Sequence, residues 1–263
     1  MYRRTGNRRR GDDHRRRPDP YAPILALNPL WSYRPLFSLV TLDGSDNVSR
    51  IADETDPTNA TKDLLQTTEA SRPAWLASSS APTGVPAIRG DGLVDILGGS
   101  AGNALSAANL YTIYALLVCP TTLSGSESAV GIGRDDGLQS WVGLGPMGVG
   151  RFATHRRSGP VGSLQTATVV AAGETVWIEG AYNPATVMNV SDSSGGANSA
   201  AAPGTFSGSQ YLLSLCGAFG VVAGGLPSEF SDAEVLAYVG WNSILSAPDR
   251  AIVGAALSAY GGI

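Results

Sequence analysis

The chain has 263 residues, of which 43% are hydrophobic and only 15% are charged, and it contains 33 glycines and 16 prolines. This composition favours short strands joined by turns, and its hydrophobic fraction excludes a disordered chain. No apolar run approaches the ~18 residues of a membrane-spanning helix, so we expect no membrane contact. No secretory signal follows the first residues, so we expect the protein to be made in the cytoplasm and to be soluble there.

The formal net charge of −4 conceals a strong asymmetry. Residues 1–17 carry eight arginines against two aspartates, whereas the remainder carries ten basic and twenty acidic residues. A basic tail on an acidic body is typical of an interaction segment. We predict that the arm binds a partner protein through arginine–carboxylate pairs, and the less favoured alternative is that its arginines pair with nucleic-acid phosphates. The arginines of this arm are Arg3, Arg4, Arg8, Arg9, Arg10, Arg15, Arg16 and Arg17.

The chain divides into three predicted parts. Residues 1–20 form the basic arm. Residues 21–35 contain three prolines among large apolar side chains, and we expect an extended docking segment without helix that lies against the domain. Residues 36–263 form the domain, beginning with a strand over 36–42 and a turn over 43–47.

Strands and turns dominate the rest of the domain. Tyr111–Cys119 is almost continuously apolar, which predicts a central strand buried on both faces. Thr166–Ala171 and Thr175–Tyr182 are predicted to pair, and residues 191–204 are predicted to be a loop. Further strands are expected over Ala129–Ile132, Ser140–Leu144, Gly148–Ala153, Thr186–Val190 and Gln210–Cys216.

The end of the chain predicts one helix. Ser246 is a good N-cap, Pro248 fits the first turn, and Gly261 with Gly262 ends the helix. Residues 231–239 are ambiguous, because Ser231 to Glu234 is a capping-box pattern whereas the following residues include strand formers.

Two blocks of sequence resemble one family in order and spacing. The second block runs from Asp232-Ala-Glu-Val-Leu-Ala-Tyr238 through the terminal helix to Tyr260-Gly-Gly-Ile263. The first includes Tyr21-Ala-Pro, Leu42 to Asp53, Asn59-Ala-Thr61, Arg72-Pro73 and Val85-Pro-Ala-Ile-Arg-Gly-Asp-Gly92. They resemble the concanavalin A-like, laminin-G-like lectin/glucanase sandwich found in structural proteins of tailed bacteriophages. Trp31-Ser-Tyr-Arg-Pro departs from relatives that continue with an acidic residue.

The resemblance implies an all-β fold: a two-sheet antiparallel jelly-roll sandwich with one short C-terminal helix, preceded here by the extended arm. It also assigns residues 231–239 to a strand. It implies a non-enzymatic virion protein, a surface decoration or projecting module anchored by its arm to other virion proteins of the capsid or tail. The alternative is a lectin-like host-adhesion module of a tail or head fibre that binds host glycans. Fold alone does not separate these functions.

The residues argue against catalysis. Family glucanases use closely spaced carboxylates, whereas Glu174 and Glu179 are five residues apart on a strand and therefore on opposite faces. A serine or cysteine nucleophile needs a base, and the chain offers only His14 in the arm and His155 in a basic loop. We therefore predict no enzymatic activity.

We also predict no metal or cofactor. Calcium is the alternative, through carboxylates near Asp43 and Asp46 or near Asp53 and Asp56, but such side chains more often stabilise turns. Cys119 and Cys216 are predicted to be buried free thiols and not a disulfide.

Trp177 and Trp141 are the candidate contacts to a ligand or subunit. In the sequence Thr175-Val-Trp-Ile-Glu, alternation directs Val176 and Ile178 inward and Trp177 outward. We expect Trp177 to be partly exposed in the isolated chain and covered by a protein neighbour in an assembly.

Overall fold

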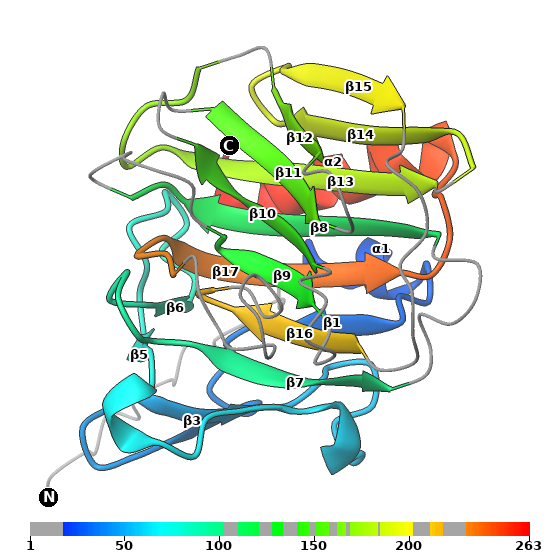
Figure 1. Cartoon of the computed structure of the whole chain (residues 1–263). Coiled ribbons are helices and arrows are strands. Elements are labelled where there is room, and N and C mark those ends of the chain that lie inside the picture. The colour runs from blue at the N-terminus through cyan, green and yellow to red at the C-terminus, as the bar shows by residue number, and fades with distance from the viewer. Residues whose placement is uncertain are drawn as a thin grey trace, which may run out of the picture.

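The chain folds into two antiparallel sheets packed face to face, with helices outside one of them (Figure 1). The computed structural model describes residues 18–102, 110–120, 128–133, 141–147, 151–157, 162–166, 169–183, 185–201, 211–217 and 230–263. Residues 1–17 of the arm, which include all eight of its arginines, lie outside the described residues. The part of the chain that the structure describes contains no helix long and apolar enough to cross a membrane.

The first sheet has the strand order β15-β14-β13-β8-β17-β6-β5, and β1 also pairs with β17. The neighbouring strands pair antiparallel throughout. The strands are β1 (Trp31–Tyr33), β5 (Ala74–Leu76), β6 (Ala87–Arg89), β8 (Tyr111–Val118), β13 (Thr175–Asn183), β14 (Val187–Asp192), β15 (Ala197–Ala201) and β17 (Glu234–Trp241).

The second sheet has the order β12-β11-β10-β9-β16-β7-β4-β3-β2. Its strands are β2 (Val40–Leu42), β3 (Val48–Ile51), β4 (Leu64–Leu65), β7 (Leu97–Gly102), β9 (Val130–Gly133), β10 (Trp141–Met147), β11 (Arg151–Arg157), β12 (Gly162–Gln165) and β16 (Tyr211–Leu215). The remaining elements are helix α1 (Ala22–Leu25), the 3-10 turns η1 (Ala60–Lys62) and η2 (Glu69–Ser71), and helix α2 (Ala247–Gly261).

Strand β8 is buried along its whole length, as its continuous apolar sequence predicts. Ile113, Ala115 and Leu117 belong to the core between the sheets, whereas Leu116 and Val118 pack in a second cluster with α2. Helices and the segment after residue 20 cover the outer face of this sheet. Both faces of a central strand can therefore be apolar.

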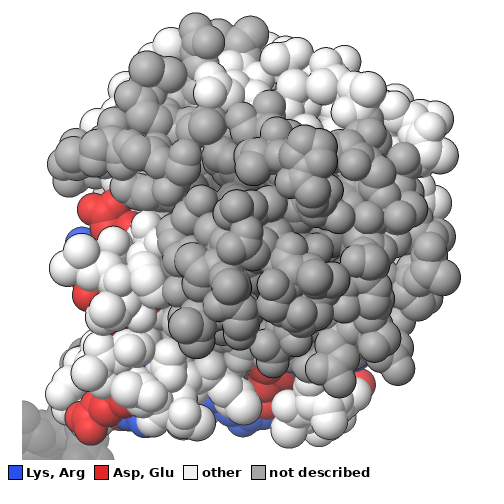
Figure 2. Space-filling view, in the orientation of Figure 1, with Lys and Arg blue, Asp and Glu red and all other residues white. Residues whose placement is uncertain are grey.

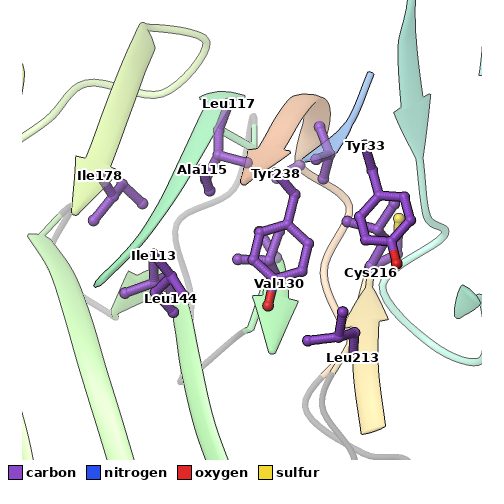
Figure 3. Packing of buried hydrophobic residues seen from close by; sticks show 14 of the residues in the cluster. Tyr33, Ile113, Ala115, Leu117, Val130, Leu144, Ile178, Leu213, Cys216 and Tyr238 are labelled. Atoms are coloured by element: carbon purple, nitrogen blue, oxygen red, sulfur yellow. The ribbon is translucent and has the colours of Figure 1, made fainter. Parts of the chain in front are cut away.

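The core between the sheets contains large aromatic side chains, among them Tyr33 and Tyr238 (Figure 3). The hydroxyl of Tyr238 donates to the carbonyl of Gly131 at 3.1 Å, and that of Tyr33 donates to the carbonyl of Lys62 at 2.6 Å. These bonds offset the cost of burying each phenol and link the two sheets. Burial raises the pKa of both tyrosines well above 10, so they remain protonated.

The segment 21–35 packs against the sandwich as expected, but the prediction that it contains no helix is wrong. Pro23 lies in the first turn of α1, where a missing N–H costs no hydrogen bond. Tyr21 and Ile24 are fully buried, and β1 joins the first sheet beside β17. The predicted strand over 36–42 is confirmed only from Val40, because residues 36–39 form a turn.

Three other predictions need correction. The described residues of the predicted strand 166–171 form no strand, and β13 instead pairs with β8 and β14. The predicted loop 191–204 contains β15, an edge strand with all five residues exposed. His155 lies on β11 opposite Gly143, where sequence predicted a loop. Only the pairing of β13 with β8 joins segments that are distant in sequence, whereas β15 and β11 each pair with the strand that precedes them in the chain.

The end of the chain matches its prediction. Ser246 accepts a hydrogen bond from the backbone N–H of Asp249, and Gly262 ends the helix with φ +80°. Residues 234–241 form β17, as the resemblance indicated. The two cysteines are buried free thiols, as predicted. Burial raises the pKa of Cys119 to about 12 and that of Cys216 further, so neither is a nucleophile at neutral pH.

Candidate functional site: an acidic cleft at one end of the sandwich

A cleft of about 400 Å³ opens where the loop between β6 and β7 meets the start of β17. These two segments come from the two sequence blocks that carry the resemblance, although they lie some 140 residues apart. We call this hollow the acidic cleft. Its lining residues are Ala74, Ser80, Arg89, Gly90, Asp91, Asp95, Val118, Cys119, Pro120, Gly173, Asp232 and Glu234.

Close backbone packing fixes the inner wall of the acidic cleft. A Cβ atom on Gly90 would lie 2.5 Å from the carbonyl oxygen of Ser231 and 2.9 Å from the Cβ of Cys216. No side chain fits there, so the loop approaches the β17 segment only with glycine at this position. This contact holds the two halves of the site together.

Asp91 organises the loop above that wall. One of its carboxylate oxygens accepts hydrogen bonds from the backbone N–H groups of Leu93, Val94 and Asp95, at 2.8, 2.8 and 3.1 Å. Partial burial opposes ionisation, but these donors outweigh it and lower the pKa of Asp91. The loop is therefore fixed, while the side chains of Leu93 and Val94 are 72% and 47% exposed.

Glu234 builds the opposite wall. Its carboxylate is almost buried and accepts hydrogen bonds from the backbone N–H and the hydroxyl of Ser80, at 2.7 and 2.9 Å. In the strand register Glu234 lies opposite Arg89. Glu234 thus holds the 77–86 segment against β17.

Three charged side chains of the acidic cleft are not used in this way. Among the described residues, the side chains of Arg89, Asp95 and Asp232 form no hydrogen bond or ion pair with another side chain or with the backbone. Partial burial and the nearby Asp91 raise the pKa of Asp95 to about 6. These three groups remain available to a ligand, whereas Asp91 and Glu234 maintain the site.

A second polar cluster lies between α2 and the outer face of the first sheet. Glu179 accepts hydrogen bonds from Tyr114 at 2.9 Å and Ser191 at 3.1 Å, and pairs with Arg250 at 2.7 Å. Burial and the neighbouring Glu179 raise the pKa of Tyr114. Each of these four side chains has a partner within the cluster, which therefore attaches the helix to the sheet. It borders a hollow of about 470 Å³.

Trp177 lies at the edge of that hollow. Val176 and Ile178 are fully buried and Trp177 is half-buried, in agreement with the predicted alternation. The indole N–H donates to Ser258 at 3.1 Å, and the ring packs against Gly254 of α2. The neighbour that partly covers Trp177 in this chain is its own terminal helix. A contact to ligand or subunit remains a prediction.

The other two tryptophans considered as ligand contacts are Trp141 and Trp241. Trp141 lies on β10 in register with Gly133 and Arg157, but its side chain is outside the described structure. Trp241 is buried, and its indole N–H donates to the carbonyl of Leu27.

The candidate calcium residues act within turns. Asp43 accepts hydrogen bonds from the backbone of Ser45 and Asn47 and pairs with Arg72. Asp53 accepts from Ser32 and Thr55, and lies 3.8 Å from Lys62. Within the described ranges no group of three or more histidine, cysteine or acidic side chains is arranged to hold a metal ion.

The two glutamates considered for glycoside hydrolysis do not form a catalytic pair. Glu174 is exposed in the turn before β13, where it accepts a hydrogen bond from the backbone of Ala171. Glu179 is buried under α2. The two carboxylates lie in different environments because Glu174 precedes β13 and Glu179 lies on it, so the prediction that both lie on one strand is wrong.

Sequence reasoning did not identify the acidic cleft. Arg89, Asp91, Asp232 and Glu234 all lie in the quoted blocks, but their proximity depends on the pairing of β6 with β17. The sequence feature that could have indicated the acidic cleft is the presence of acidic residues in both blocks.

Solved structures share this architecture. Domain 4 of AbnA, an extracellular GH43 arabinanase from Geobacillus stearothermophilus solved with arabinotriose, is 17% identical, with a TM-score of 0.55 over 78% of this chain and 92% of that domain. A Trypanosoma rangeli sialidase solved with the inhibitor DANA is 12% identical, with a TM-score of 0.54 over 87% of this chain and 32% of that one. The CBM40 of a Ruminococcus gnavus sialidase, bound to α2,3-sialyllactose, is 12% identical, with a TM-score of 0.46 over 55% and 82%.

The chain folds as a two-sheet antiparallel jelly-roll sandwich. At these identities the similarity establishes the fold and leaves the ligand open. No protein-family model matches the sequence, and no curated protein is significantly similar to it.

Proposed function

We propose that this chain is a non-catalytic carbohydrate-binding module whose ligand occupies the acidic cleft. The observation that carries the proposal is that the charged residues of the acidic cleft fall into two groups, one that holds its walls and one that is left unpaired. Asp91 and Glu234 hold the walls, whereas the side chains of Arg89, Asp95 and Asp232 line an open hollow and have no partner in the part of the chain that the structure describes. Unpaired charged groups at a preformed hollow are typical of ligand recognition.

The chemistry of the acidic cleft suits a sugar. Carboxylates accept hydrogen bonds from sugar hydroxyls, and the guanidinium of Arg89 donates to hydroxyl or ring oxygens. Leu93 and Val94, exposed on the loop that Asp91 organises, offer an apolar surface outside the lining of the cleft. Binding of arabinotriose by the arabinanase domain supports the proposal, because that domain has the same fold over most of this chain.

Glycan binding by the full chain tests this function. We expect an array to identify a ligand, and Arg89→Ala and Asp232→Ala each to weaken it about tenfold, as loss of a charged hydrogen bond of ~1.4 kcal/mol predicts. Glu69→Gln, in the exposed turn η2, is the control and should bind normally. Full binding by both cleft variants, or no glycan ligand at all, would overturn the proposal.

Absence of catalysis is tested separately. Incubation of the chain with polysaccharides that it binds should release no reducing ends, because Glu179 is paired with Arg250 and Glu174 lies apart from it. Hydrolysis that is lost in Glu174→Gln or Glu179→Gln would show an enzyme.

A second candidate is a virion structural protein, favoured by the eight arginines of residues 1–17 and by the resemblance of the two sequence blocks to phage proteins. In this proposal the arm anchors the sandwich to a capsid or tail scaffold. Deletion of residues 1–17 should then abolish incorporation into particles and leave the domain folded, and high salt should weaken attachment. Normal occupancy of particles by the truncated chain would exclude the anchoring role.

A further inference from the structure

A second hollow adjoins the acidic cleft and continues it along the same end of the sandwich. It has a volume of about 580 Å³, and Ser80 and Gly173 line both hollows. Together they form one groove, which we call the end groove. The residues that line its second half are Ser80, Pro82, Gly173, Glu174, Thr175, Ser193, Ser194, Ser258 and Ile263.

Hydroxyl groups dominate the second half. The hydroxyl oxygens of Ser193 and Ser258 accept hydrogen bonds from the backbone and indole N–H groups of Trp177, at 3.2 and 3.1 Å. Each hydroxyl is thereby positioned and keeps its O–H group and a lone pair for another partner. Neutral groups that both donate and accept match the hydroxyls of a sugar.

The charge of the end groove is strongly one-sided. Five carboxylates line it, and Arg89 is its single basic residue among the described lining residues. Acidic atoms also appear at the left margin of Figure 2, the end at which β8 ends and β13 begins in Figure 1. An anionic ligand would be repelled at short range. The carboxylates are Asp91, Asp95, Glu174, Asp232 and Glu234.

We propose that the end groove binds a stretch of several units of a neutral oligosaccharide chain and rejects sugars that carry a carboxylate. The inference rests on the proposed function and narrows its ligand. Each hollow is within the size range of a small-molecule site, so the two together exceed what one sugar unit fills. Both hollows are open, which allows a chain to run through them.

Ligand length and charge test this inference directly. With the full chain in titration calorimetry, a neutral hexasaccharide of the preferred sugar should bind at least tenfold more tightly than the trisaccharide, because it reaches both hollows. Lactose and α2,3-sialyllactose form a matched pair that differs by one anionic sugar, and so do neutral and uronic-acid chains of equal length. The anionic member should bind at least tenfold more weakly.

Variants locate the effect. In Gly173→Asn the side chain enters open space at the junction of the hollows, since nothing lies within 4 Å of a Cβ there, and asparagine tolerates the local φ of +76°. This variant should remove most of the advantage of the hexasaccharide and leave trisaccharide binding nearly unchanged. Gly195→Asn is the control, because its φ of +85° and open surroundings are similar and it lines neither hollow. Thermal melts of both confirm folding.

The double variant Asp95→Asn with Asp232→Asn keeps hydrogen-bonding groups and removes two charges. It should reduce the ratio of the affinity for the neutral ligand to the affinity for the anionic ligand at least threefold. Tighter binding of the anionic partner by the native chain, or equal affinity for tri- and hexasaccharide, would overturn the inference while leaving carbohydrate binding intact. Absence of any glycan binding would overturn the proposed function and this inference with it.

Discussion

Arg34 shows how one buried charge can connect distant parts of a chain. Its side chain is 4% exposed, and its guanidinium pairs with Glu54 and, at 3.0 Å, with Asp19. The guanidinium lies 4.2 Å from the ring centroid of Tyr21 and 5.4 Å from that of Tyr260. These contacts join the first helix, the loop after β3 and the terminal helix. Burial opposes its charge, but Glu54 more than compensates and raises the pKa of Arg34. The residue stays charged at every accessible pH.

Replacement of this residue should be costly. Arg34→Met leaves the carboxylates of Glu54 and Asp19 without their partner, and we expect a loss of about 3 kcal/mol in the free energy of unfolding. Urea denaturation measures it. The double variant Arg34→Met with Glu54→Gln should recover part of the loss, since it removes the orphaned charge. Unchanged stability of the single variant would contradict the role assigned to Arg34.

Asp95 makes stability depend on pH. The folded chain raises the pKa of Asp95 from its ordinary value of 3.8 to about 6. Between pH 3.8 and pH 6 the folded state therefore binds more protons than the unfolded state. The contribution of Asp95 to the free energy of unfolding is therefore favourable below pH 4 and is lost as the pH rises through 6. Asp95→Asn should raise the melting temperature at pH 7 and change it little at pH 4. An equal effect at both values would contradict the shifted pKa.

At the scale of elements, the sequence predicts best those strands and helices that their own residues determine, without contacts to distant parts of the chain. The buried strand β8 and helix α2 follow from an apolar run and from a cap, a proline and two glycines. Segment 21–35 was misjudged because a proline in the first turn is compatible with a helix. The acidic cleft could not be predicted, because the proximity of Arg89 to Asp232 depends on the register between β6 and β17.

The N-cap of α2 gives a prediction at this scale. Ser246→Ala removes the hydrogen bond to the backbone of Asp249 and should lower the free energy of unfolding by about 1 kcal/mol, measured by chemical denaturation. Ser243→Ala, at an exposed position just before the helix, should have little effect. Equal losses in both variants would show that the cap does not contribute.

At the scale of the whole molecule, we predict that the folded domain begins before Asp19, within the arm as first defined, because Asp19 pairs with the buried Arg34 at 3.0 Å. Deletion of residues 1–17 should leave the melting temperature unchanged, whereas deletion of residues 1–20 removes the ion pair of Asp19 with Arg34 and should lower it. Scanning calorimetry of the two truncated chains separates these outcomes. The same melting temperature for both would place the boundary after residue 20.

The contacts of Arg34 also bring the start of the sandwich beside its end, since Tyr21 and Tyr260 pack edge to face with ring centroids 5.5 Å apart. The first and last residues of the folded domain therefore lie close together in space. A short linker from Ile263 to Pro18, with new ends opened in the exposed turn at Ser45, would give a circularly permuted protein with the same contacts. The order of the strands along the chain would change, while the architecture in space would not.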